Sequence, residues 1–201
     1  MKQEERRQQT TRRLMEATRA LIEEKGCNSI TMQDIVGRSG LSKGAIFHYV
    51  KSKDEIFVWL LQEGLEETNQ RFMSEIEQGH RRFEEPMQQI AESIIQYENP
   101  LNVTNKVLLY LLGKEKDPVV GEALKLYYDR SVYLSRLWIE TGQRYGVIPE
   151  SVEADKTAEM FTLMTLGLRI RSSIPGTEAV FKAHDITAWM TSMLNPPKEG
   201  K

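Results

Sequence analysis

The sequence lacks several features on which particular classes of protein depend. It has one cysteine among 201 residues, Cys27, so no disulfide can form within the chain. Its three histidines lie far apart, at positions 48, 80 and 184, whereas zinc ligands usually occur in clusters. The longest apolar runs, residues 56–61 and 107–112, are six residues each, against the ~20 that a membrane-spanning helix needs. We therefore expect neither a metal site nor a membrane partner.

The sequence also lacks the motifs of catalysis and secretion. It has no cluster of catalytic histidines, no phosphate-binding glycine loop and no nucleophile elbow, so we expect a protein that is not an enzyme and needs no cofactor. The charged start of the chain is not followed by an apolar segment of the kind found in secretory signals. We therefore expect the protein to be cytoplasmic.

Charge is distributed unevenly along the chain. Residues 1–53 carry 11 lysines and arginines against 6 acidic residues, whereas the remaining residues carry 16 and 23. A basic first quarter beside an acidic remainder suggests an anionic partner at the N-terminal end. A solvated basic arm explains the charge equally well.

Hydrophobic periodicity predicts an all-α protein. Apolar residues recur at spacings of three and four, and the alternation typical of strands is absent. Thr31 with Asp34, Ser42, Ser52 with Glu55, and Asp117 before Pro118 are typical helix starts. Nine helices are expected, over about residues 4–25, 31–39, 43–49, 52–78, 86–98, 102–113, 118–145, 151–171 and 178–194.

The second and third of these helices predict a helix-turn-helix motif. Only Ser39, Gly40 and Leu41 join them, and a short turn containing glycine between two short helices is typical of this DNA-binding arrangement. The second helix of such a pair enters the major groove, and its N-terminal amides favour phosphate. The predicted DNA contacts are Thr31, Ser42, Lys43, Gly44, Ala45, Phe47, His48, Tyr49 and Lys53. Ile35, Ile46 and Val50 are assigned to the core.

The same segment, ITMQDIVGRSGLSKGAIFHYVKSKDEIF, resembles the DNA-binding domain of the TetR family of bacterial transcription regulators. The resemblance rests on Thr31, the Asp34-Ile35 pair, the turn ending in Gly40, the Ser42-Lys43-Gly44 run and the Lys51–Asp54 run. It covers roughly residues 10–60. Two positions depart from the family pattern, since Phe47 stands where the family often has Tyr and Val50 where it often has Phe.

The resemblance implies a homodimeric repressor that binds a near-palindromic operator in double-stranded DNA and is released by a small-molecule effector. It implies a helix-turn-helix domain over residues 1–52, a helical regulatory and dimerisation domain over 53–194, and a loose tail over 195–201. An activator, or a regulator controlled by a protein partner, stays open as the alternative.

The expected helix over 118–145 carries two apolar stripes, one through Val120 and Tyr127 and another through Val119 and Leu126. A helix that is apolar on two sides is usually surrounded by other helices. Arg130 falls within the second stripe, where it needs either an internal acidic partner or an anionic ligand. The candidate ligand-binding residues are Tyr97, Tyr110, Tyr127, Arg130, Leu134, Trp138, Met160 and Met164.

The last two helices are the expected dimer interface. The resemblance implies a four-helix bundle built from these two helices of each subunit. The candidate interface residues are Ala158, Phe161, Gly167, Leu168, Phe181, Trp189 and Met193.

Overall fold

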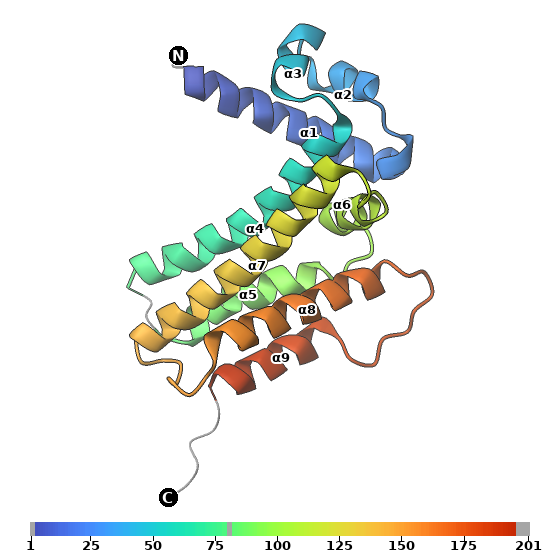
Figure 1. Cartoon of the computed structure of the whole chain (residues 1–201). Helices are drawn as coiled ribbons and strands as arrows, with labels where there is room; N and C mark the ends of the chain where they lie inside the picture. Colours follow the sequence, from blue (N-terminus) through green and yellow to red (C-terminus); the bar gives the residue numbers. More distant parts are fainter. Residues whose placement is uncertain (1–2, 80–81, 196–201) are drawn as a thin grey trace, which may run out of the picture. The chain divides into compact units, whose positions relative to one another are not determined.

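A computed structural model describes residues 3–79 and 82–195, and within these ranges the chain forms nine α-helices and no strand (Figure 1). The all-α prediction is confirmed. Residues 196–201 of the predicted tail lie outside the described ranges. None of the described helices has the length and apolar character needed to cross a membrane. The described residues also contain no group of three or more His, Cys, Asp or Glu side chains suited to hold a metal ion.

The helices follow the predicted order. They are α1 (Gln3–Ser29), α2 (Met32–Ser39), α3 (Lys43–Tyr49), α4 (Lys53–Glu77), α5 (Glu84–Gln96), α6 (Val103–Leu112), α7 (Pro118–Arg144), α8 (Ala154–Ser172) and α9 (Ala183–Leu194). A break inside α1 falls at Gly26, whose φ of 72° is one that glycine adopts readily.

Local side chains fix several of these boundaries. The Asp117 carboxylate accepts hydrogen bonds from the amides of Val119 and Val120 at 2.9 and 3.4 Å, so α7 begins at Pro118 as expected. The start of α9 was predicted too early. The Asp185 carboxylate accepts from the amide of Lys182 at 2.8 Å, and this contact sets the first turn at Ala183.

The chain divides into two compact units. The first unit comprises Met1–Gly64 and Val103–Lys125, and the second comprises Leu65–Asn102 and Leu126–Lys201. Helices α4 and α7 therefore contribute residues to both units. The predicted division of the chain into domains at residues 52 and 53 stays a prediction.

The first unit holds the short helices in place through a shared core. Helix α1 packs against α2 and α6. The buried side chains of this unit include Leu14, Ile22, Ile35, Ile46, Val50, Phe57 and Val107. Ile35, Ile46 and Val50 are at most 1% exposed, which confirms their assignment to the core.

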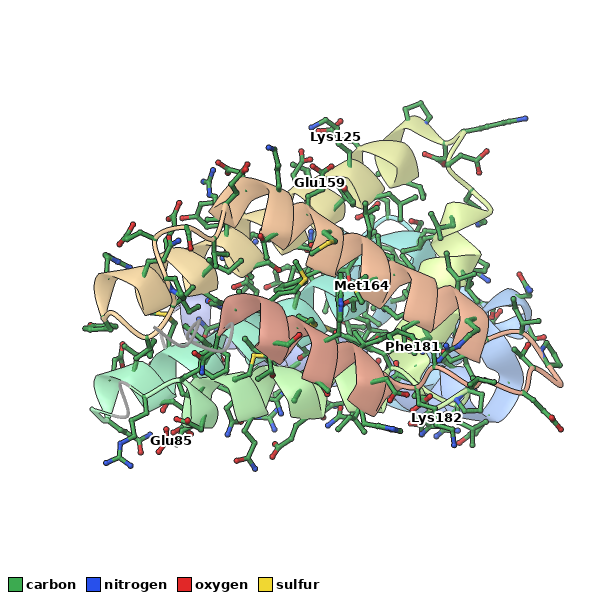
Figure 2. The ribbon with its side chains drawn as sticks, turned by 90° about the horizontal axis from the view of Figure 1, so that it is seen from below. Glu85, Lys125, Glu159, Met164, Phe181 and Lys182 are labelled. Carbon is green, nitrogen blue, oxygen red and sulfur yellow. The ribbon has the colours of Figure 1, made fainter. Side chains whose placement is uncertain are left out.

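The second unit has a core of its own, to which α5, α7, α8 and α9 contribute. Helix α9 packs against both α5 and α8, and α8 and α9 lie side by side on one face of the unit (Figure 2). The core includes Met87, Ile94, Ile139, Phe161, Leu168, Ile186 and Met190.

One prediction about α7 is wrong. Its first apolar stripe is buried, with Val120 at 2% and Tyr127 at 7% exposure. Its second stripe is not covered by other helices of the described chain, since Val119, Leu126 and Tyr133 are all exposed. The sequence pattern identified two apolar stripes, but it contained no information on which of them would be packed.

Candidate DNA-binding site

The helix-turn-helix is built around Gly40, which ends α2. Its φ of 62° lies in the left-handed region, where a side chain is disfavoured. The guanidinium of Arg13 on α1 donates to the carbonyl of Ser39 at 2.8 Å, immediately before the turn. A Cβ atom at Gly40 would lie 3.2 Å from that guanidinium. The turn is thus tied to α1, and α1 helps to position the helix that follows.

Helix α2 begins with the predicted capping box. The Thr31 hydroxyl accepts from the amide of Asp34 at 3.2 Å, and the Asp34 carboxylate accepts from the Thr31 amide and hydroxyl at 2.9 and 2.7 Å. These hydrogen bonds from Thr31, assisted by Lys25, lower the pKa of Asp34 to about 2. The hydroxyl proton of Thr31 is therefore directed at Asp34, so capping is the role that the local geometry supports.

Helix α3 has one buried face and one open face. Ile46 is fully buried, and the Ser42 hydroxyl accepts from the amide of Ala45 at 3.2 Å, which caps the first turn. Ala45 and Tyr49 are half-buried. The exposed residues are Ser42, Lys43, Gly44, Phe47 and His48, which come from the predicted set of DNA contacts.

The open face of α3 combines charge, aromatic edges and bare backbone. The Lys43 ammonium lies 5.8 Å from the centre of the Phe47 ring, and the His48 and Tyr49 rings meet edge to face at 5.1 Å. No atom lies within 4 Å of where a Cβ of Gly44 would be, so the backbone is open there. A surface with these properties can approach a phosphate backbone closely and present side chains to base edges.

Lys53 has a different geometry from the one expected of a phosphate contact. Its ammonium donates to the backbone carbonyls of Cys27, Asn28 and Ile30 at 2.9, 3.3 and 2.7 Å. A lysine has three N–H donors, and these three bonds match that number. The carbonyls lie at and just after the end of α1, where a positive charge is favoured. Lys53 thus joins α1 to α4, and this geometry argues against the predicted phosphate contact.

Comparison with known proteins finds a match over the segment that contains the helix-turn-helix. The sequence profile of the bacterial regulatory proteins of the tetR family matches residues 14–59. This segment of the chain is thus similar to the bacterial regulatory proteins of the tetR family. YfiR of Bacillus subtilis, an uncharacterized HTH-type transcriptional regulator, is 35% identical over 54 residues, which are 27% of this chain and 26% of that protein. The match thus spans about a quarter of the length of this curated relative.

Solved structures share the fold along most of the chain. A TetR transcription regulator from Haloarcula marismortui has a TM-score of 0.66 at 18% identity, over 93% of this chain and 97% of its own. A transcriptional regulator from Saccharomonospora viridis in complex with choline has a TM-score of 0.64 at 21% identity, over 92% and 95%. These structures show that the chain shares their fold, and the family match concerns residues 14–59.

The predicted ligand-binding residues do not form one group. Arg130 makes a two-pronged ion pair with Glu66, at 2.7 and 3.1 Å, and the two side chains are 43% and 40% exposed. The acidic-partner interpretation of Arg130 is therefore the correct one, but the pair lies at the surface and not inside. Tyr110 belongs to the first unit, where its hydroxyl donates to Asp54 at 3.0 Å beside Lys114.

Three of the predicted residues do line one cavity of the second unit. Tyr97, Tyr127 and Trp138 all border it, and we call it the polar cavity. Leu134 is fully buried without bordering it, and Met160 and Met164 are packed against the hydrophobic core. Tyr97, Tyr127 and Trp138 thus remain candidate ligand-binding residues.

Sequence reasoning missed the charged residue of this cavity, Arg169. Its side chain on α8 is 1% exposed, its guanidinium donates to the Tyr127 hydroxyl, and it lies 4.6 Å from the centre of the Tyr97 ring. The available signal was its helical spacing: Thr162 and Thr165, at i−7 and i−4, also border the cavity.

The predicted interface residues fall into two groups. Ala158, Phe161 and Leu168 are at most 4% exposed and belong to the core of their own subunit, so they are not available to a partner. Met193 is half-buried against the same core. Gly167, Phe181 and Trp189 are exposed. The interface prediction was wrong for the buried residues because a helix with apolar residues on both faces gives no sign of which face turns inward.

Proposed function

We propose that the chain is a sequence-specific DNA-binding transcriptional regulator that acts in the cytoplasm as a homodimeric repressor. The observation that carries this proposal is the open face of α3. Ser42, Lys43, Gly44, Phe47 and His48 are exposed on a helix that Ile46 anchors to the core. These exposed side chains are not part of the core, and their chemistry suits the major groove of DNA.

A homodimer explains how so short a helix achieves specificity, since two copies read two half-sites of a near-palindromic operator. The surface we assign to the dimer is the outer face of α8 and α9, the face turned to the viewer in Figure 2. Leu163, Gly167, Ile170 and Ile174 follow one another at helical spacing and are all exposed. Trp189 on α9, 41% exposed, adds an aromatic side chain. Exposed apolar surface of this kind is typical of a protein interface.

Release by a small molecule is the second part of the proposal. Pockets lined by residues of the second unit favour a small ligand over a protein partner as the controlling signal. A ligand can release the operator only by binding the non-binding conformation more tightly than the binding one.

Selection of bound DNA from a random pool, followed by sequencing, tests the proposal. We expect a motif with two-fold symmetry and an affinity that falls steeply with salt, because several phosphates are neutralised. The protein is also denatured and refolded before selection, to remove any bound ligand. If the refolded protein enriches no motif, the proposed sequence-specific DNA binding is contradicted. An asymmetric motif would contradict the dimer.

A further inference from the structure

Most basic side chains of the N-terminal segment already have a partner within the first unit. Ion pairs at 2.6 to 3.1 Å join Arg12 to Glu16, Arg19 to Glu63, Lys25 to Asp34 and Arg38 to Glu24. Arg13 and Lys53 donate to backbone carbonyls instead. Among the described residues 3–53, the basic side chains with neither kind of partner are Arg6, Arg7, Lys43 and Lys51, all of them exposed. The side chains open to an anionic partner thus lie at two places, beside α3 and near the start of α1.

Arg6 and Arg7 lie on the face of α1 that is turned to the helix-turn-helix. Seven residues make almost two helical turns, so Arg6 shares a face with Arg13. For the same reason Arg7 shares a face with Leu14. Arg13 donates to the Ser39 carbonyl immediately before the turn, and Leu14 is fully buried. The two arginines therefore continue this face about 10 Å beyond the turn. Figure 1 shows the first turns of α1 running out past α3.

This position suits the sugar-phosphate backbone of a duplex that α3 enters. The major groove is about 12 Å wide, so side chains about 10 Å beyond the turn can reach the strand at the edge of the groove. Long side chains of a helix also lean towards its N-terminus, which carries the two guanidinium groups further outwards. A guanidinium matches a phosphate in charge and in hydrogen-bonding geometry.

We propose that Arg6 and Arg7 bind the phosphate backbone beside each half-site, so that the protein holds a longer stretch of duplex than α3 alone covers. This proposal rests on the proposed function, since it adds a second contact with the same DNA. It also decides between the two explanations of the basic first quarter, because a solvated arm would leave DNA binding independent of both arginines. Phosphate contacts position a protein on DNA without reading its sequence.

Salt titration with two duplexes of equal length tests the proposal. One is the operator enriched by selection, and the other has mixed sequence. Affinity is measured by fluorescence anisotropy between about 0.05 and 0.2 M salt. The double variant Arg6→Gln, Arg7→Gln should reduce the slope of log affinity against log salt by about 2 on both duplexes, because each phosphate contact contributes ~0.9. Its affinity at the lowest salt should fall at least ~tenfold, and the loss should shrink as salt is raised.

Two control variants separate a located contact from a general loss of charge. Arg12→Gln removes a positive charge from the same helix, but Arg12 pairs with Glu16 and lies about 120–140° around the helix from the arginine pair. Its slope should change by less than about 0.5. Arg6→Lys with Arg7→Lys keeps both charges and should keep the slope. Since both positions are exposed, every variant should melt within about 2 °C of the wild type.

Duplex length locates the contact. Operator duplexes trimmed stepwise from both ends should lose affinity for the wild type before they lose it for the double glutamine variant, which has no contact outside the half-sites. If trimming affects both proteins equally, the contact does not lie beside the half-site. A preference for A·T pairs in the selected flanks would indicate that the arginines enter the minor groove, and would overturn the phosphate assignment.

The two duplexes keep this proposal separate from the proposed function. Equal slopes for the wild type and the double glutamine variant on both duplexes would overturn the phosphate contact, while an enriched motif would leave the regulator standing. Conversely, the wild type could enrich no motif and yet lose slope on mixed-sequence DNA when both arginines are replaced. That result would support the phosphate contact and contradict sequence-specific regulation.

Discussion

Replacing Lys53 by Met separates a structural lysine from a DNA-binding one. The variant removes three hydrogen bonds from the ammonium to the carbonyls of Cys27, Asn28 and Ile30 while keeping most of the alkyl chain. A hydrogen bond that involves a charged group contributes ~1.5–3 kcal/mol. Desolvation lowers the pKa of Lys53, which opposes the gain, and water can reach the carbonyls in the variant. We therefore expect a loss of about 2 kcal/mol in the free energy of unfolding.

Thermal unfolding of the full chain measures this loss. A chain of this size loses ~2–4 °C in Tm per kcal/mol, so Lys53→Met should melt about 4–8 °C below the wild type. Lys51→Met is the matched control for stability, because Lys51 is exposed, and its Tm should change by less than about 2 °C.

Salt dependence of operator binding completes the test. Lys43→Met removes a candidate phosphate contact and should reduce the slope of log affinity against log salt by about 1, whereas Lys53→Met should leave the slope unchanged. The reasoning is refuted if Lys53→Met melts like the wild type and shows the reduced slope, since Lys53 would then bind phosphate after all.

Three further predictions concern single positions. The lowered pKa of Asp34 means that its contribution to stability is present above about pH 4 and fades as the pH falls towards 2; the difference in Tm between wild type and Asp34→Asn should shrink over that window. Gly40→Ala forces a side chain into the left-handed region and should lower the free energy of unfolding, measured in urea, by ~1–2 kcal/mol. Gly44→Ala lies in a helix with open space around it, so it should raise that free energy by ~0.5–1 kcal/mol and yet weaken operator binding. Leu163→Glu should give a folded monomer in light scattering after gel filtration, and Leu168→Glu an unfolded chain by circular dichroism; a dimeric Leu163→Glu would exclude the assigned surface.

Sequence reasoning succeeded where structure depends on neighbours in the chain. Helix α3 begins and ends at the predicted residues because Ser42 caps it through a contact three residues away. Helix α7 likewise begins at the predicted residue, Pro118, because Asp117 caps it. The helix-turn-helix was recognisable for this reason: its order, spacing and caps are all local.

Sequence reasoning failed where the outcome depends on which apolar face of a helix is covered by other helices. Phe161 and Leu168 were assigned to the dimer, yet they are buried in their own subunit, while Leu163 on the same helix is exposed. Residues 161, 163 and 168 are all apolar, and periodicity alone cannot rank them. For a related reason, the partner of Arg130 was expected inside the protein and Arg169 was missed, since the partner of each lies on another helix, at Glu66 and Tyr127.

The open face of α3 has a consequence for how this protein can change over evolutionary time. Lys43, Phe47 and His48 are exposed, while the helix is anchored through Ile46 on its opposite side. Substitutions at the outward positions therefore cost little stability, and under the proposed function most of their effect falls on which DNA is bound. A duplicated copy of the gene can acquire a new operator by such changes alone, with no compensating change in the core.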